Sequence, residues 1–262
     1  MKIQLLVNQD LASTLVINRL VPALQDHELS IWCSSQVGTS NQARPPALAH
    51  LAFMEQGILN QLLPGASGGE LQTISALAAS RGISCRIENA PNGPAALANL
   101  TSFRPDLMVS VRYGKILRQA CLGFPGYGVI NLHSGRLPDY RGVMATFRAM
   151  LAGEKTIGAT LHYIDDDSVD TGRIIGMTDI PVNYAGSYLH NVLALYHDGV
   201  ELILTTIADI AKGESPRTLT QRNGGNYYSF PDQPALDAFS ARGLRLFDHE
   251  EVIRLYQRFS PV

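Results

Sequence analysis

Short apolar runs alternate with helix-length amphipathic segments along the first half of this chain. Ile3–Asn8 is apolar, Leu11–Leu24 repeats Leu, Val and Ile at helical spacing, and Leu29–Cys33 is apolar again. Such alternation is typical of a parallel sheet that carries helices on both faces. The sequence therefore predicts an α/β fold with a doubly wound, Rossmann-like, mostly parallel sheet.

The alternation continues along the chain, and the composition changes near Gly213. Further strands are expected at Ile83–Ile87, Asp106–Val111, Gly128–Leu132 and Lys155–Ile164. Helices are expected at Ala47–Leu63, Glu70–Arg81, Ala95–Ser102, Ile116–Cys121, Met144–Met150 and Ser187–Ala211, and a loop at Val37–Pro46. A stretch rich in Asn, Gly, Tyr and Pro then precedes two helical stretches, with bounds Gln221–Pro234, Ala235–Ala241 and His249–Phe259. We expect a main domain over residues 1–212 and a small C-terminal extension over residues 213–262.

Charge and cysteine content narrow the classes of function. A net charge of −2 leaves no electrostatic footprint for a nucleic-acid backbone. No apolar run reaches the roughly 18 residues that span a bilayer. The three scattered cysteines suit buried thiols in a reducing compartment better than a disulfide framework. We expect a cytoplasmic monomer or homodimer without nucleic-acid or membrane partners.

Two polar segments carry the chemistry. Asn131 and His133 stand two residues apart at the end of the expected strand Gly128–Leu132, so period-2 alternation directs both side chains to the same side. In an open parallel sheet, that end of the strand faces the binding crevice. A carboxylate, Asp170, closes the acidic loop that begins at Asp165. An amide donor, a titratable base and an orienting carboxylate are the groups needed to move an acyl group onto an amine.

Four short motifs connect these residues to a known family. In chain order they are Asn131-x-His133, Leu137-Pro-x-Tyr-Arg-Gly142, Gly158-x-Thr-x-His162 and Asp170-Thr-Gly172. Their order and separations resemble those of the folate-dependent formyltransferases, which include glycinamide ribonucleotide, methionyl-tRNA, amino-sugar and hydroxyornithine formyltransferases. The resemblance is strong over residues 100–182 and rests on the strand–helix pattern alone over the first hundred.

The resemblance implies a role for each polar residue. Asn131 would hydrogen-bond the formyl oxygen and stabilise the oxyanion of the tetrahedral intermediate, a contribution of roughly 3–4 kcal/mol. His133 would hold the same oxygen and take part in proton transfer from the attacking amine, commonly worth about 10²–10⁴ in rate. Asp170 would orient the imidazole and, with a water, carry the proton to the leaving folate nitrogen.

The resemblance also implies a folate site. The donor would be 10-formyltetrahydrofolate, and no metal would be required. One wall of the pterin pocket would be the strip Arg112, Tyr113, Gly114, Lys115, Ile116 and Leu117. The other wall would be the backbone of the loop that contains Asp165, Asp166, Asp167 and Val169.

Structural roles compete with these assignments. Taken singly, Asn131 and His133 are more simply satisfied polar groups at a strand end, and His162 is expected to pack or to support other residues. The sequence leaves three partners open for Arg112 and Lys115: solvent, the folate glutamate tail and an anionic substrate group. Arg141 is expected to anchor its own loop.

Two differences between this chain and familiar members of the family narrow the choice of formyl acceptor. After the first strand, Asn8–Ser13 contains no glycine to close on a phosphate, which disfavours a ribonucleotide. The short segment after residue 213 and the negative net charge disfavour tRNA. We expect a small amine or hydroxylamine: N-hydroxyornithine first, a nucleotide-linked amino sugar next.

A formyltetrahydrofolate hydrolase and a non-catalytic folate-binding protein are the alternatives, although hydrolases of this family carry an N-terminal domain and the first strand here begins at Ile3. The stretch Gln221–Pro234 either covers the acceptor pocket or is a packed extension.

Overall fold

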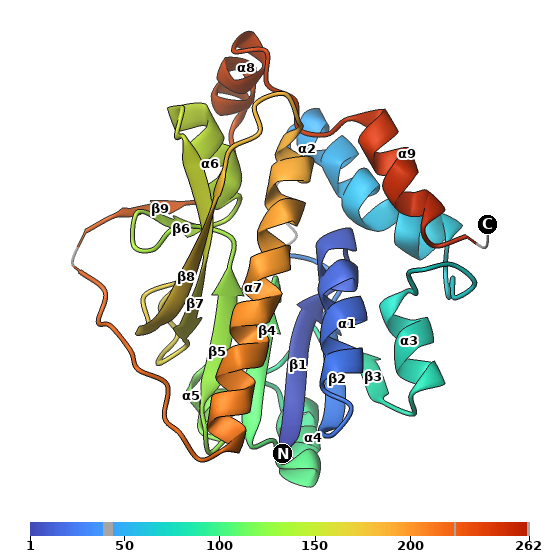
Figure 1. The fold of residues 1–262 in the computed structure, drawn as a ribbon, viewed down its shortest axis with the longest axis vertical. Helices are drawn as coiled ribbons and strands as arrows, with labels where there is room; N and C mark the ends of the chain where they lie inside the picture. Colours follow the sequence, from blue (N-terminus) through green and yellow to red (C-terminus); the bar gives the residue numbers. More distant parts are fainter. Residues whose placement is uncertain (39–43, 223, 261–262) are drawn as a thin grey trace.

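The computed structural model describes residues 1–38, 44–222 and 224–260. Within that part of the chain, one sheet has seven strands in the order β3-β2-β1-β4-β5-β7-β8 (Figure 1). The strands from β3 to β5 run parallel, and β7 and β8 are antiparallel to their neighbours. The direction of the strand order reverses between β1 and β4, so the crevice between their carboxyl ends is the topological switch point.

The strands of this sheet are short and mostly apolar. They are β1 (Lys2–Asn8), β2 (Glu28–Ser34), β3 (Ser84–Ile87), β4 (Leu107–Val111), β5 (Val129–His133), β7 (Thr156–Tyr163) and β8 (Ile174–Pro181). Two further strands, β6 (Tyr140–Gly142) and β9 (Asn226–Tyr228), form a small parallel pair.

Helices cover both faces of the sheet. They are α1 (Leu11–Ala23), α2 (Pro46–Ala52), the π-helix η1 (Phe53–Leu62), α3 (Ile74–Ser80), α4 (Pro94–Phe103), α5 (Gln119–Leu122), α6 (Ala145–Ala152), α7 (Tyr188–Ala211), α8 (Gln233–Ala241) and α9 (His249–Gln257). Polar side chains begin several of them: Asp10 accepts from the Ser13 N–H at the start of α1, and Ser187 caps α7.

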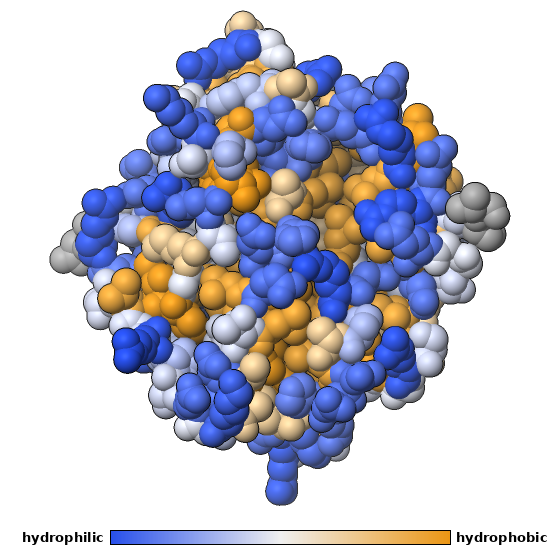
Figure 2. Space-filling view, viewed as in Figure 1, coloured by the Kyte–Doolittle hydropathy of each residue, from blue (hydrophilic) through white to orange (hydrophobic). Residues whose placement is uncertain are grey.

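The alternating sides of the strands build two cores. Leu5 belongs to the large core under α1 and α7, whereas its neighbour Leu6 belongs to a smaller core with Trp32 under α4 and α5. Figure 1 shows α1 and α7 in front of the sheet and α4 and α5 behind it. The outer surface on the α7 side is mixed, with hydrophilic residues around hydrophobic ones near its centre (Figure 2).

The predicted fold class is confirmed, and the differences lie at weak or short elements. The expected helix at Ile116–Cys121 reduces to α5, and the helix expected from Glu70 begins after Thr73, whose hydroxyl caps it. Strand β8 was not predicted; only its first residue, Ile174, is buried, and the others are half-buried or exposed. The expected loop Val37–Pro46 falls largely on residues 39–43, outside the described residues.

The C-terminal segment packs back onto the main domain. Strand β9 pairs with β6, and α8 stacks Phe239 against Phe147 of α6, with ring centroids 4.4 Å apart. On α9, the Tyr256 hydroxyl donates to the Met54 carbonyl of η1. Residues 213–260, apart from residue 223, therefore contact three parts of the preceding chain: β6, α6 and η1. In the described part of the chain, no helix combines the length and apolar content needed to cross a membrane.

Candidate active site

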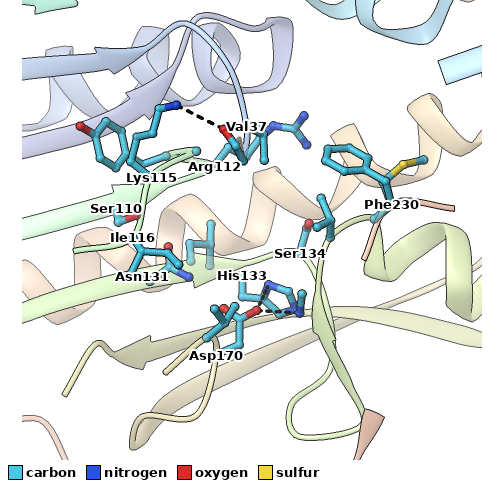
Figure 3. A pocket seen from close by; sticks show the side chains of 18 of the residues that line it. Val37, Ser110, Arg112, Lys115, Ile116, Asn131, His133, Ser134, Asp170 and Phe230 are labelled. Carbon is cyan, nitrogen blue, oxygen red and sulfur yellow. Dashed lines mark hydrogen bonds and ion pairs between the residues drawn. The ribbon is translucent and has the colours of Figure 1, made fainter. Parts of the chain in front are cut away.

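A cavity of about 370 Å³ opens at the carboxyl ends of the parallel strands. Its size falls within the range of small-molecule sites. Asn131 and His133 line it, and residues from both faces of the sheet form its walls. Figure 3 shows Asn131, His133 and Asp170 together, with Ile116 and Lys115 to one side and Phe230 to the other.

The structure brings Asn131, His133 and Asp170 together at the cavity. Asn131 and His133 are alternate residues of β5 and both line the cavity. The Oδ2 atom of Asp170 lies 3.4 Å from Nδ1 of His133. The other ring nitrogen, Nε2, donates to the Tyr140 carbonyl oxygen at 2.7 Å, because a carbonyl oxygen only accepts. Tyr140 therefore fixes the ring through Nε2, and Nδ1 can donate to Asp170 only when the imidazole is protonated.

Asp170 is buried among groups that stabilise its charge. Its Oδ2 atom accepts from the backbone N–H of Gly142 at 2.8 Å. Burial by itself raises the pKa of Asp170, but the nearby His133, His162 and the Gly142 N–H outweigh burial and hold this pKa at about 2. Asp170 is thus a carboxylate at neutral pH, suited to orienting and stabilising a protonated imidazole.

Gly142 connects the loop after β5 to the Asp170 carboxylate through its backbone N–H. Its φ of 94° is in the region that favours glycine, and an added Cβ would lie 2.1 Å from the Tyr228 carbonyl oxygen. Only glycine lets β6 approach β9 closely while it donates its N–H to Asp170. The Arg-Gly end of the Leu-Pro-x-Tyr-Arg-Gly motif therefore has a specific backbone function at this site.

His162 is a site residue for which sequence reasoning expected only a packing or supporting place. Its Nδ1 atom donates to the Tyr163 carbonyl at 2.8 Å, so in the neutral ring Nε2 accepts from the Asn131 side-chain amide at 3.1 Å. His162 Nε2 also lies 3.5 Å from Asp170 Oδ1. His162 faces Asn131 in the antiparallel register of β5 and β7, which the strand patterns alone do not fix. Its one signal in the sequence was its place in the Gly-x-Thr-x-His motif. His162 therefore orients the side-chain amide of Asn131. The second N–H of that amide remains available to the cavity.

One side of the cavity, which we call the Tyr113 arm, contains Tyr113, Gly114, Lys115, Ile116, Leu117 and residues 166–169. The Tyr113 hydroxyl donates to the Glu88 carbonyl at 2.7 Å, and an added Cβ at Gly114 would lie 2.4 Å from the Gln36 carbonyl oxygen. Among the described residues, the backbone N–H groups of Ile116 and Leu117 have no hydrogen-bond partner. These free donors fit the edge of a heterocycle such as a pterin.

Two residues predicted for this wall have other partners. The Asp165 carboxylate is paired with Arg173 at 2.8 Å, and Asp165 is not among the described residues that line the cavity, although Asp166, Asp167 and Val169 are. Lys115 lines the arm, and its Nζ atom donates to the Gly38 carbonyl at 3.3 Å (Figure 3).

The opposite side, which we call the Glu55 arm, is built around Arg112. The Nε atom of Arg112 donates to Asp10 at 2.8 Å, and one of its terminal nitrogens donates to Glu55 at 3.0 Å. Asp10 and Arg112 stand at the carboxyl ends of β1 and β4, the strands that flank the switch point. The sequence left the partner of Arg112 open, and the structure supplies two carboxylates. Reasoning from sequence missed Asp10 and Glu55, because nothing along the chain connects them to Arg112.

Two tyrosines of α7 complete the Glu55 arm. Tyr188 and Tyr196 are both buried and both line the cavity. The Tyr196 hydroxyl has no hydrogen-bond partner among the described residues. Burial raises the pKa of Tyr196, and the Arg112 guanidinium beside it acts in the opposite direction.

The two arms lie over opposite faces of the sheet. Tyr113 and Leu117 pack with the smaller core under α4 and α5, and Tyr188 and Tyr196 belong to the large core under α1 and α7. The end of β5, with Asn131 and His133, stands between the arms. This arrangement can hold two different molecules on either side of one reacting centre. Among the described residues, no cluster of three His, Cys, Asp or Glu side chains is placed to hold a metal ion.

The C-terminal stretch contributes to the cavity wall. Tyr227 and Phe230 line the cavity, whereas Tyr228 stacks on Tyr140 with ring centroids 6.0 Å apart. The stretch Gln221–Pro234 is thus both packed and cavity-lining in its described part, which excludes residue 223. Arg141 pairs in register with Tyr227 of β9 and is not among the described lining residues.

Comparison with known proteins shows the family of this chain. A family model described as formyl transferase matches residues 74–222. The chain is 31% identical to a methionyl-tRNA formyltransferase from Thermobifida fusca over 216 residues, which is 80% of this chain and 69% of that relative. It is 37% identical to the methionyl-tRNA formyltransferase of Halothermothrix orenii over 134 residues, 50% of this chain and 41% of that relative. The fold and these matches together establish that the chain belongs to the formyl transferase family.

Solved structures share the fold at low sequence identity. The formyltransferase PseJ from Anoxybacillus kamchatkensis, in complex with UDP-4,6-dideoxy-4-formamido-L-AltNAc and tetrahydrofolate, aligns with a TM-score of 0.54 and 18% identity. That alignment covers 97% of each chain. In contrast, the chain spans less than half the length of several curated methionyl-tRNA formyltransferases that it matches.

Proposed function

We propose that this protein transfers a formyl group from 10-formyltetrahydrofolate to the nitrogen of a small amine or hydroxylamine. The observation that carries the proposal is the convergence of Asn131, His133 and Asp170 between two arms of one cavity. The free backbone donors of the Tyr113 arm suit the pterin of the donor. The free thiols Cys33, Cys85 and Cys121 suit the cytoplasm, where we place the reaction.

Asn131, His133 and Asp170 have different roles in the proposed reaction. Asn131, held by His162, directs its second amide N–H at the formyl oxygen and stabilises the negative charge that develops there. The Nε2 atom of His133 is engaged by Tyr140, so the edge that takes part in proton transfer is Nδ1, which faces Asp170. The Asp170 carboxylate stabilises the imidazolium that forms. When bound, the folate supplies the activated formyl group.

For the acceptor, we favour N-hydroxyornithine over a nucleotide-linked amino sugar. At the start of α1, the buried carboxylate of Asp10 accepts from the Ser13 N–H, so an anion already occupies the helix N-terminus where a phosphate would bind. A methionyl-tRNA acceptor is the second candidate, because proteins with that name are related in sequence over most of this chain. Against it stands the net charge of −2.

Incubation with 10-formyltetrahydrofolate tests the proposal. We expect formyl transfer to N5-hydroxy-L-ornithine, which mass spectrometry of the product detects. When no acceptor is present, we expect little release of formate. Rapid formate release without an acceptor would identify a hydrolase. Transfer to methionyl-tRNA alone would replace the small-molecule acceptor, and folate binding without any turnover would identify a binding protein.

A further inference from the structure

Ser110 stands on the side of the cavity that contains the Tyr113 arm. It lies on β4, where its register partners are Leu6 of β1 and Asn131 of β5. Register partners in a sheet point to the same face, and Leu6 belongs to the smaller core under α4 and α5. Ser110 therefore faces the same side as Asn131, and both line the cavity next to each other (Figure 3).

The Ser110 hydroxyl is a polar group without a partner in the described part of the protein. Only 4% of the residue is exposed, and its hydroxyl makes no hydrogen bond within the described residues. Two polar side chains on the same face have such partners. The Asn131 amide donates to His162 at 3.1 Å, and the Ser34 hydroxyl at the end of β2 accepts from the Gly114 N–H at 2.9 Å. Ser110 differs from Ser34, since its hydroxyl is left for a molecule in the cavity.

Apolar side chains share this side of the cavity with Ser110. Leu117 belongs to the smaller core, and Leu117, Ile116 and Ile164 all line the cavity. In such a setting a buried hydroxyl is unfavourable unless it finds a hydrogen-bond partner, and alanine would suit the apolar neighbours equally well. The hydroxyl at this position therefore indicates a polar atom of a bound molecule.

Two other contacts define where the folate donor would lie. The free N–H groups of Ile116 and Leu117 suit the outer edge of the pterin, and the Asn131 amide suits the formyl oxygen. The strip with Ile116 follows β4 along the chain, and adjacent strands lie about 5 Å apart, so Ser110 stands between these two contacts. A donor that spans them passes Ser110 with its reduced ring. In that ring N5 carries a hydrogen, and two carbon atoms separate N5 from N10, which bears the formyl group.

From this placement we infer that Ser110 binds the reduced ring of the folate donor, and that its hydroxyl oxygen accepts a hydrogen bond from N5–H. The inference rests on the proposed function through its folate donor and adds a residue that recognises this donor. A serine hydroxyl accepts hydrogen bonds as well as donating one, so N5–H satisfies it. A ring with carbon in place of N5 leaves the hydroxyl unpaired beside apolar side chains, which weakens binding.

A pair of ligands isolates the contact with N5. Tetrahydrofolate carries N5–H, and 5-deazatetrahydrofolate has a CH₂ group at the same place. For the wild-type protein we expect calorimetric titration to show at least about threefold tighter binding of tetrahydrofolate. In Ser110→Ala this ratio should fall close to one, through loss with tetrahydrofolate only. Equal affinities in the wild type, or equal losses for both ligands in Ser110→Ala, would overturn the inference.

Ser34→Ala is the matched control, because Ser34 holds the Gly114 N–H of the same arm and lies at the end of another strand. We expect this variant to weaken the binding of both ligands by a similar factor and to keep the preference for tetrahydrofolate. Loss of the preference in Ser34→Ala as well would show that the ratio reports the shape of the arm and not a contact with Ser110.

Stability measurements test whether the Ser110 hydroxyl has a partner inside the protein. Ser110→Ala removes only an unpaired hydroxyl, so the urea midpoint of the protein without ligand should stay the same or rise. A lower midpoint would indicate an internal hydrogen bond and would contradict a hydroxyl reserved for the ligand.

The titrations need no acceptor and no formyl transfer, so they separate this inference from the proposed function. Equal affinities for the two ligands, together with formyl transfer to N5-hydroxy-L-ornithine, would reject the Ser110 contact alone. A preference for tetrahydrofolate that Ser110→Ala abolishes supports the contact even if no transfer is found, and that result would reject the proposed reaction alone.

Discussion

The Tyr113 arm and the Glu55 arm of the cavity are built in different ways. Tyr113–Leu117 and the loop at residues 166–169 lie within the segment that the formyl transferase model matches, residues 74–222. The Glu55 arm takes Asp10 and Glu55 from outside that segment and joins them to Arg112, which lies inside it. One arm offers mainly backbone groups of a continuous strip, and the other offers charged side chains from distant elements. The comparison teaches that most of the Tyr113 arm comes from one local strip, whereas the Glu55 arm depends on how distant parts of the chain fold together.

The largest effect is expected where charge is buried. Arg112→Ala leaves Asp10 buried without its guanidinium, which should lower the free energy of unfolding by about 3–5 kcal/mol. Urea unfolding measures this loss. Arg173→Ala is the control, because Arg173 pairs with Asp165 at the surface and should change stability by less than about 1 kcal/mol. Similar small losses for both variants would show that the Glu55 arm does not depend on its cation.

Changes at the centre, between the arms, should affect the rate and not folate binding. We expect Asn131→Ala, His133→Ala and Asp170→Asn each to reduce turnover by at least about 10², with little change in folate affinity. Steady-state kinetics and folate titration measure the two quantities. Near wild-type rates in any two of these variants would reject the proposed catalytic role.

The pH dependence of stability tests the charge of the Glu55 arm. The pKa of Glu55 is raised from 4.5 to about 7 in the folded protein, so the native state favours its protonated form. That contribution to stability is complete below pH 4.5 and is lost as the pH rises to about 7. Relative to Glu55→Gln, the wild type should therefore lose about 2–4 kcal/mol across this window. Chemical unfolding at several pH values measures the difference, and a pH-independent difference would contradict the raised pKa.

The smallest effect is expected on the Tyr113 arm. Tyr113→Ala should weaken folate affinity by about tenfold while the bound complex turns over at nearly the normal rate. Its side chain packs against the core under α4 and α5, away from Glu55. The opposite pattern, with slower turnover and unchanged folate affinity, would assign Tyr113 to the acceptor.

Much of the fold could be predicted because the patterns that indicate its strands and helices lie within short stretches of sequence. Period-2 alternation in β5 puts Asn131 and His133 on the same side, and helical spacing marks α1 and α7. The same local reasoning failed for β6 and β9, which have three residues each and are stable only as a pair. His162 was undervalued because its contact with Asn131 depends on the register between β5 and β7.

By itself, the sequence determined the α/β class, the family resemblance and the polar residues at the end of β5, because apolar periodicity and motif spacing are properties of neighbours along the chain. Tertiary structure alone decided that Asp170 reaches His133 and that Asp10, Glu55 and Arg112 meet beside the Tyr196 hydroxyl. These contacts join residues from 37 to more than 100 positions apart. Their formation depends on the strand order at the switch point and on the packing of η1 and α7, which no local pattern encodes.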